Sequence, residues 1–549
     1  MSKTISSLYN MMWASHKQTK RLLTFSPVTE KNATKGNTKV EKDVKDKFEG
    51  YESPTPSYTK SQMIGLFLGP LLFLLTLFVF PLSGLSEPGR AVMAITLWIA
   101  TWWITEAIPI PLTSLMPIVL LPLMGTISGD LAAKSFGDPL IFLFLGGFAI
   151  AIAMEKWNLH ERIALTIIAI VGTSTAGIVF GFMIATAFIS MWVSNTATVM
   201  MMLPIGTAIA AKVVDLMKQE GVYSEEDDTK ITKSLIFAIG FGGTIGGAST
   251  LIGTPPNLIL AGMVQELFGI EISFASWFFF AFPMTTVLLV FAGFYLTKIA
   301  YPMKVKKLNS GRAFVVKSRN ELGRMSYEEK VVLAVFSLTA FMWLSRTFLW
   351  QGIIPGISDT MIAVTGALLL YLFPASKGRG RILDQHSIKQ MPWGVLLLVG
   401  GGLSLATGFR ETDLANWIGS QLLYMEHVPF VVALLVTTLL ALALTEITPN
   451  TATTTILVPV VASLALAIDV HPFPLMFATA LGAGFAFMLP IGTPSNAIIF
   501  ATGKLTIMDM VKKGFWMNII AIISIVAAVY ILLPIVFGID LFHYPESLK

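Results

Sequence analysis

Two short polar segments that share an asparagine and a threonine interrupt apolar sequence in this 549-residue chain. Residues 193–198 read VSNTAT, and residues 448–453 read TPNTAT. The Asn amide and the Thr hydroxyl both donate and accept hydrogen bonds, so they can contact a cation through oxygen and an anion through hydrogen. A single small polar residue in an apolar helix usually serves helix packing. An Asn-Thr pair that occurs twice instead predicts one binding site built from two halves.

A second pair of repeated segments consists of residues that break helices. Residues 252–257 read IGTPPN, and residues 491–496 read IGTPSN. Proline removes an N–H donor, and glycine tolerates unusual backbone dihedrals. Backbone groups freed inside a membrane must be satisfied by protein, water or ligand, because leaving them unpaired is costly. Freed carbonyls can bind Na⁺, and freed N–H groups at helix starts can bind a carboxylate.

A constant spacing relates the two sets of motifs. Asn450 lies 255 residues after Asn195, and the same offset takes Pro204 to Pro459. The Gly-Thr-Pro segments lie 239 residues apart, so the first half carries 16 additional residues. These additional residues fall in the polar segment 212–233, which we interpret as a loop. The chain therefore contains two internal repeats.

The composition indicates a membrane protein. Hydrophobic residues make up 54% of the chain and charged residues only 13%, whereas a soluble protein carries about 25% charged residues. Apolar stretches long enough to cross a bilayer recur along the chain. Examples are Met63–Leu82, Ala91–Ile108, Val331–Leu349 and Ile519–Ile535. The expected fold class is an all-α polytopic membrane protein, with the lipid bilayer as its surroundings.

Several other classes of protein are excluded. No cysteine is present, so disulfides, thiol nucleophiles and thiolate metal sites are excluded. The net charge of +5 does not indicate a nucleic-acid partner, because Lys and Arg cluster in loops as the positive-inside rule expects. An enzyme would need a nucleophile with a nearby base, which the motifs lack. A channel would need a continuous polar pore, whereas these polar motifs have apolar flanks.

The basic loops predict the topology in a plasma membrane. Basic residues place the segments 31–60, 304–324 and 377–381 in the cytoplasm. Threading the apolar spans between these segments gives about 11 transmembrane helices, by the bilayer-spanning length rule. The N-terminus is then cytoplasmic and the C-terminus extracellular. The regions 176–211 and 429–467 fit this count only as re-entrant hairpins, which enter and leave by the same face.

The expected organisation is two repeats that are inverted relative to each other. The segments are a disordered cytoplasmic tail (1–60), a first transmembrane helix (61–90), repeat one (91–300, broken helix at 253–257), a cytoplasmic linker (301–327) and repeat two (328–541, broken helix at 492–496). The span that starts near Pro139 runs inward, and its mate near Pro392 runs outward. Inverted repeats with broken helices are typical of secondary transporters, whose site lies at the repeat interface.

One acidic residue lies close to the second Asn-Thr motif. Glu446 precedes Asn450 by four residues, and the equivalent position in the first repeat is Met191. A structural role, in which the carboxylate bonds to backbone or pairs with a distant cation, is favoured over direct ion binding. Neither motif contains Lys, Arg, His or Cys, and a proton-relay mechanism usually needs an ionisable group in the membrane.

At these motifs the sequence resembles the divalent anion:sodium symporter family, in particular its bacterial sodium-dependent dicarboxylate symporters. The resemblance covers residues 60–540 and includes both Asn-Thr motifs and both Gly-Thr-Pro segments. It implies 11 transmembrane helices with two re-entrant hairpins, a homodimer, and elevator-type alternating access. It also implies Na⁺-coupled uptake of succinate, fumarate, malate and related dicarboxylates, with Na⁺ as coupling ion and no other cofactor.

The resemblance also assigns site residues. Sodium site 1 would use Ser190, Ser194, Asn195 and Gly253, and sodium site 2 would use Thr445, Asn450 and Gly492. The dicarboxylate would contact Asn195, Thr196, Thr254, Pro255, Asn450, Thr451, Thr493 and Pro494. Ser190 and Thr445 each precede their asparagine by five residues, and this equal spacing supports the assignment.

The second motif departs from the pattern of the family. The family has Ser-Asn-Thr in both repeats, whereas Pro449 replaces the second serine here. Proline has neither a hydroxyl nor an N–H group to donate. We expect transport to persist with altered affinity or selectivity. The alternatives are a sodium-independent dicarboxylate or citrate antiporter of the same broad family, and a transporter of inorganic oxyanions such as sulfate.

Overall fold

The computed structural model describes residues 58–171, 174–221, 223–302, 319–378, 380–422 and 428–548. Regular structure within these ranges is helical, apart from one isolated β-bridge between Pro374 and Arg381. The all-α fold class is therefore confirmed. The tail predicted over 1–60 lies almost entirely outside the described residues, as does most of the linker predicted over 301–327.

The first helices precede the site. They are α3 (Lys60–Phe78), α4 (Glu87–Thr105), α5 (Ile110–Thr113), α6 (Met116–Leu123), α7 (Gly129–Lys134) and the 3₁₀ turn η1 (Ser135–Gly137). Helix α4 begins with Glu87 and Pro88 behind the N-cap Ser86, a combination that favours helix initiation. Helix α3 ends at Phe78, so it is shorter than the first transmembrane helix expected over 61–90. The start of α4 lies inside that range.

The first Asn-Thr motif lies at the start of a helix, directly after the turn that follows the preceding helix. The helices of this repeat are α8 (Pro139–Lys156), α9 (Leu159–Val171), α10 (Thr175–Ser190), α11 (Asn195–Gln219), α12 (Glu225–Ala248), α13 (Pro255–Phe268), α14 (Phe274–Phe294) and the π-helix η2 (Tyr295–Ala300). Helices α10 and α12 pack closely because Gly246 of α12 lies against the backbone of α10. A Cβ at Gly246 would lie 2.1 Å from the Ala187 carbonyl oxygen, which leaves no room for a side chain.

The second repeat has the same order of hairpin and broken helix. Its elements are α16 (Tyr327–Ser345), η3 (Arg346–Trp350), α17 (Gln351–Ile353), α18 (Asp359–Leu372), η4 (Ser376–Gly378), α19 (Gln385–Lys389), α20 (Trp393–Glu411), α21 (Leu414–Gln421), α22 (Phe430–Thr445), α23 (Asn450–Ala467), α24 (Pro472–Gly484), α25 (Pro494–Ala501), α26 (Ile507–Phe537) and η6 (Glu546–Leu548). Helices α22 and α23 form the hairpin, and α24 and α25 are the two parts of the broken helix.

The additional residues of the first repeat lengthen helices instead of forming a long loop. Helices α11 and α12 have 25 and 24 residues, whereas α23 and α24 have 18 and 13. The segment 212–233 is therefore mostly helical. Four acidic residues occupy the first turn of α12.

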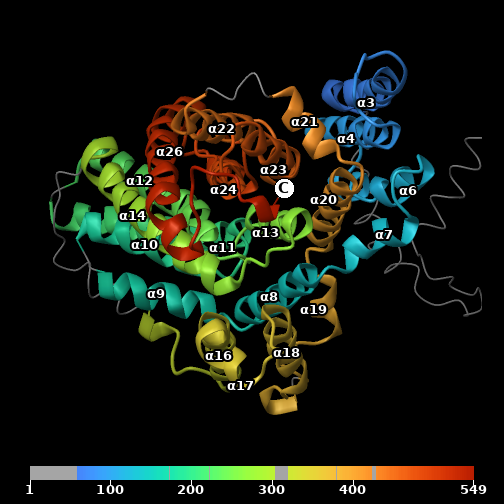
Figure 1. Cartoon of the computed structure of the whole chain (residues 1–549). Coiled ribbons are helices and arrows are strands. Elements are labelled where there is room, and N and C mark those ends of the chain that lie inside the picture. The colour runs from blue at the N-terminus through green and yellow to red at the C-terminus, as the bar shows by residue number, and fades with distance from the viewer. Residues whose placement is uncertain are drawn as a thin grey trace, which may run out of the picture. The chain divides into compact units, whose positions relative to one another are not determined.

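The two repeats meet along the hairpins and the broken helices. Helix α13 packs against α20, α23 and α24, and α11 packs against α25. Figure 1 shows α23 and α24 of the second repeat beside α13 of the first. Within the described ranges, nine helices are long and apolar enough to cross a membrane by length and composition. The expected number of 11 crossings and the re-entrant path of the hairpins stay predictions.

Candidate functional site

A cavity of about 310 Å³ lies where the two repeats meet. It is lined by Phe148, Ser194, Asn195, Thr196, Ile252, Gly253, Thr254, Pro255, Pro256, Pro392, Val395, Pro449, Asn450, Thr451, Gly492, Thr493, Pro494 and Ser495. All eight residues predicted to contact a dicarboxylate are in this set. The structure therefore brings together both Asn-Thr motifs and both Gly-Thr-Pro segments, which are far apart in the sequence.

Four helices begin at this cavity. They are α11 from Asn195, α13 from Pro255, α23 from Asn450 and α25 from Pro494. A helix start carries unpaired N–H groups and a partial positive charge, so it attracts anions. None of the described residues that line the cavity is an Asp, Glu, His, Lys or Arg. Attraction for an anion therefore comes from backbone dipoles and neutral side chains.

Three oxygen atoms meet beneath the first Asn-Thr motif. The Ser190 hydroxyl lies 2.8 Å from the Asn195 Oδ1 atom and 2.7 Å from the Gly243 carbonyl oxygen. A hydroxyl has one hydrogen to donate, so it can satisfy only one of these acceptors at a time. Ser190 is fully buried. The cluster is rich in oxygen lone pairs, which suits a small hard cation.

The second Asn-Thr motif has the same arrangement. The Thr445 hydroxyl lies 2.6 Å from the Asn450 Oδ1 atom and 2.7 Å from the Ala483 carbonyl oxygen. Asn450 also donates through Nδ2 to the Gly484 carbonyl oxygen at 3.4 Å. Thr445 is fully buried, as Ser190 is. Two equivalent oxygen clusters thus lie behind the cavity wall, one in each repeat.

Equivalent asparagines bind the unwound segments of the broken helices. The Asn257 amide donates to the carbonyl oxygens of Gly247 (3.2 Å) and Thr250 (2.7 Å). The Asn496 amide donates to those of Ala486 and Leu489, both at 3.0 Å. These bonds satisfy carbonyls that have lost their helical partners. They keep each break open at a fixed geometry.

The unwound segments lie upstream of the expected positions. Helix α13 starts at Pro255, so residues 249–254 are outside helix, and α25 starts at Pro494, so residues 485–493 are outside helix. The predicted breaks over 253–257 and 492–496 overlap these segments only in part. The difference arises because proline is well suited to the first turn of a helix, where its missing N–H costs nothing.

Glu446 binds the backbone of the second break. Its carboxylate accepts N–H bonds from Phe487, Met488 and Leu489 at 2.9–3.2 Å. The Asn518 amide of α26 donates to the same carboxylate at 2.8 Å. Only 5% of Glu446 is exposed. The predicted structural role, with the carboxylate bonded to backbone, agrees with this geometry.

The two repeats differ in their helix caps. Ser194 accepts the N–H of Ala197 and so caps α11, whereas Pro449 provides no side-chain cap for α23. The reverse holds for the broken helices: Thr493 accepts the N–H of Asn496, whereas Thr254 makes no capping hydrogen bond. In each repeat one hydroxyl at the cavity is used as a cap. Among the residues directly before these four helices, Thr254 has a hydroxyl that does not cap its helix.

Some residues of the site were not predicted from the sequence. The carbonyls of Gly243 and Ala483 complete the oxygen clusters. Because every residue has a backbone carbonyl, the residue type does not indicate which carbonyls take part. The cavity is also lined by Phe148 of α8, by Pro392, which directly precedes α20, and by Val395 of α20. Asn257 and Asn496 did carry a signal, because both end the repeated Gly-Thr-Pro segments.

The match to a known family agrees with this geometry. Residues 60–538 match the family described as "Sodium:sulfate symporter transmembrane region". The chain belongs to this family. The resemblance stated from the motifs is thereby confirmed, and so is the assignment as a membrane transport protein and not an enzyme.

Similar proteins of known name cover almost the same length. The chain is 51% identical over 488 residues to "Sodium-dependent dicarboxylate transporter SdcS" of Staphylococcus saprophyticus, covering 88% of this chain and 94% of that protein. It is 49% identical over 497 residues to the protein of that name in Staphylococcus aureus strain USA300, covering 90% and 95%.

A solved structure supports the fold. The crystal structure of the Alcanivorax borkumensis YdaH transporter matches with a TM-score of 0.53 and 12% sequence identity. The match covers 82% of this chain and 99% of that one. At this identity the likeness supports the fold alone.

Proposed function

We propose that this chain couples the inward movement of Na⁺ to the uptake of four-carbon dicarboxylates such as succinate, fumarate and malate. One observation carries the proposal: four helix starts converge on a cavity without charged lining residues, and an oxygen cluster lies behind each half of it. Helix starts suit an anion, and oxygen clusters suit a cation. The cavity is thus equipped to take both.

The oxygen clusters are the proposed sodium sites. Site 1 comprises Ser190, Ser194, Asn195 and Gly253, to which we add the carbonyl of Gly243. Site 2 comprises Thr445, Asn450 and Gly492, to which we add the carbonyl of Ala483. Na⁺ would replace the hydroxyl hydrogen as the positive partner of the asparagine and carbonyl oxygens. Neutral ligands are sufficient because the nearby anion balances the charge.

The substrate lies between these sites in the proposal. Its contacts are Asn195, Thr196, Thr254, Pro255, Asn450, Thr451, Thr493 and Pro494. A dianion in a membrane without a cationic side chain pays a large desolvation cost. Bound Na⁺ lowers this cost, and the dianion likewise favours Na⁺. The two ligands therefore bind cooperatively, which is the physical basis of coupling.

The similar proteins support the choice of substrate. Relatives with 49–51% identity over most of the chain are named sodium-dependent dicarboxylate transporters. Sulfate is the second candidate, because the description of the matched family names a sodium:sulfate symporter. A sodium-independent dicarboxylate or citrate antiporter is the remaining alternative.

The larger-scale parts of the proposal follow from the resemblance to the family. They are a plasma-membrane location, a cytoplasmic N-terminus, an extracellular C-terminus, a homodimer, and an elevator-type movement that exposes the cavity to each side in turn. The inverted repeats support alternating access, since related but unequal halves can exchange conformations.

Uptake of labelled succinate into proteoliposomes tests the proposal. We expect uptake with an inward Na⁺ gradient, and little uptake when choline replaces Na⁺. Asn195→Ala and Asn450→Ala should each abolish or strongly weaken the Na⁺-dependent uptake. Asn416→Ala is the matched control, because Asn416 is exposed on α21 and does not line the cavity.

The alternatives give different results in the same assay. Equal uptake in choline, with succinate counterflow, would establish the antiporter and refute the symporter. Stronger competition by sulfate than by malate or fumarate would identify an inorganic oxyanion as substrate. Normal uptake by both cavity variants would refute the assignment of the site.

A further inference from the structure

A groove separate from the proposed transport cavity lies between η2, which directly follows α14, and the start of α26. It has a volume of about 630 Å³. Its lining consists of Tyr295, Ile299, Ala300, Val511, Lys512, Lys513, Phe515, Trp516 and Ile520. Large apolar side chains in it are open to the surroundings: Trp516 is 55% exposed, Phe515 49% and Ile299 63%. An apolar groove this open in a membrane protein is suited to contact with lipid or with another protein.

The sequence of α26 places the groove at the membrane surface. Residues 514–537 contain no Asp, Glu, His, Lys or Arg. A helix of that length spans about 36 Å, and the hydrocarbon core of a bilayer is about 30 Å thick. The two lysines that precede this apolar run, Lys512 and Lys513, therefore lie at the level of the lipid headgroups. Trp516 is one turn deeper, which is typical of the aromatic belt.

The charged end of the groove is positive. Lys512 is exposed and forms no ion pair within the described part of the chain, and the same is true of Lys298 on η2. Lys513 lies over the ring of Tyr301, with its Nζ atom 5.2 Å from the ring centre. The nearby carboxylate of Asp509 is bound by Lys233 at 2.7 Å and does not line the groove.

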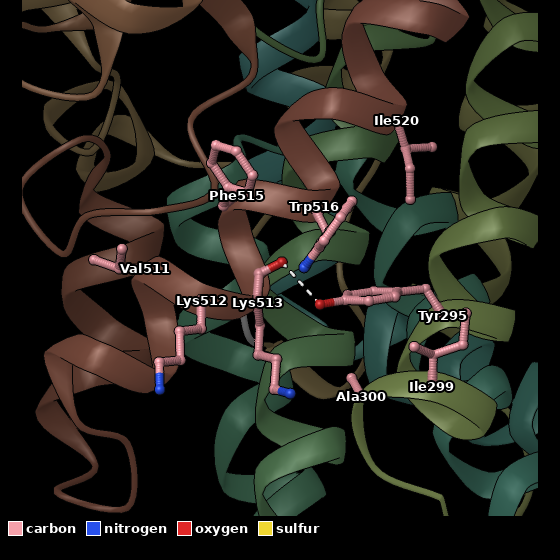
Figure 2. A pocket seen from close by; sticks show the side chains of 9 residues that line it. All are labelled: Tyr295, Ile299, Ala300, Val511, Lys512, Lys513, Phe515, Trp516 and Ile520. Carbon is pink, nitrogen blue, oxygen red and sulfur yellow. Dashed lines mark hydrogen bonds between the residues drawn. The ribbon is translucent and has the colours of Figure 1, made fainter.

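The groove has cationic groups at one end and large apolar side chains at the other, as a phospholipid has a charged headgroup and apolar acyl chains. Figure 2 shows the amines of Lys512 and Lys513 at one end, with Phe515 and Ile520 at the other. The nitrogen of the Trp516 ring is turned toward the middle, where the Tyr295 hydroxyl donates to the Lys513 carbonyl oxygen at 3.3 Å. The amines thus lie at one end of the groove, beside Ile299 and Ala300, and the large side chains of α26 lie toward the other end.

We propose that this groove binds an anionic phospholipid, with the headgroup phosphate at Lys512 and an acyl chain against Phe515, Trp516 and Ile520. Charge complementarity selects the lipid class, since a cationic end without an acidic neighbour in the groove favours a net negative headgroup. The apolar wall supplies affinity for the acyl chain but does not distinguish between headgroups. Binding would fix α14 and α26, which pack against each other.

Quenching of Trp516 fluorescence by brominated lipids tests this site. The full chain is reconstituted in bilayers of equal parts phosphatidylglycerol and phosphatidylcholine, with bromine on the acyl chains of one lipid or the other. The difference between the wild type and Trp516→Phe isolates the contribution of Trp516. We expect stronger quenching by the brominated phosphatidylglycerol. Lys512→Gln should lower this preference about fivefold, the effect of one lysine at an anionic surface.

Lys330→Gln is the matched control, because this substitution removes the same charge as Lys512→Gln. Lys330 is exposed on α16 and does not line the groove. This variant should keep the preference of the wild type, and Lys512→Arg should restore it. Equal quenching by the two lipids in the wild type would overturn the proposal. So would a Lys330→Gln variant that loses as much preference as Lys512→Gln. Absence of Trp516 quenching by either lipid would show that protein, and not lipid, covers the groove.

Discussion

The two repeats use the same chemistry at the oxygen clusters and different chemistry at the broken helices. In both clusters, a hydroxyl five residues before an asparagine lies between the asparagine oxygen and a carbonyl of the broken helix. The breaks differ in length and in charge. Residues 249–254 are bound by neutral side chains, whereas residues 485–493 are bound by the carboxylate of Glu446.

Neutral side chains bind the backbone of the first break. The Thr250 hydroxyl donates to the Met191 carbonyl oxygen and accepts the N–H of Gly253. The second break leaves three successive N–H groups together, and one carboxylate can accept all of them. The two repeats are thus alike at the oxygen clusters and differ in the groups that bind the unwound backbone.

Removal of the Glu446 carboxylate should have the largest effect. Glu446→Ala leaves the N–H groups of residues 487–489 and the Asn518 amide without an acceptor. Each buried group left unpaired costs about 1–3 kcal/mol. We expect a clearly lower thermal unfolding midpoint and loss of uptake. Thermal unfolding of the purified protein and uptake in proteoliposomes measure these effects.

Thr250→Val is the matching change in the first repeat. It removes the acceptor of one N–H group and the donor to one carbonyl oxygen, so its unfolding midpoint should lie between that of the wild type and that of Glu446→Ala. An equal or greater loss of stability in Thr250→Val would contradict the difference drawn between the two breaks.

The threonines that precede α13 and α25 should separate binding from stability. Thr493→Val removes a helix cap as well as a cavity hydroxyl, and loss of a cap costs about 1 kcal/mol. Thr254→Val removes a hydroxyl that makes no cap. Both variants should raise the KM for succinate, by about fivefold for one hydrogen bond of about 1 kcal/mol. Only Thr493→Val should also unfold at lower temperature.

Thermal unfolding and concentration-dependent uptake of the two variants check this expectation. If Thr254→Val were the less stable of the two, the assignment of the caps would be wrong. An unchanged KM in both variants would remove these hydroxyls from the substrate site.

Pro449→Ser should have the smallest effect. The backbone of Pro449 (φ −59°, ψ 134°) is close to that of Ser194 (φ −54°, ψ 144°), so a serine fits without strain. Its hydroxyl can cap α23, which stabilises the folded state. The loss of proline gives the unfolded chain more conformational freedom, which lowers the free energy of unfolding. The two effects offset each other within about 1 kcal/mol. Transport should persist, with altered relative affinities for succinate, malate and fumarate. Competition assays with the three acids measure this, and identical profiles would show that Pro449 does not affect selectivity.

Much of the site could be predicted from the sequence because the chain contains it twice. The resemblance to the family implied Ser190 and Thr445, and their equal distance from the two asparagines supported this assignment. The structure places both beside the asparagine oxygens. The starts of the broken helices were less well predicted. A Gly-Thr-Pro segment indicates that a helix is interrupted, but the unwound residues lie upstream, where Asn257, Asn496 and Glu446 bind freed backbone groups.

The sequence by itself determined the membrane fold class, the two repeats and the residue types of the binding motifs. Apolar composition, helix breakers and repeated spacing are local properties, and they need no knowledge of packing. Only the tertiary structure decided which backbone carbonyls complete the oxygen clusters and that four helix starts meet at one cavity. It also decided which hydroxyls serve as caps and that Glu446 faces three backbone N–H groups. Apart from the caps, which are local, these features depend on distances between residues 38 to 299 positions apart in the chain, which residue types alone do not specify.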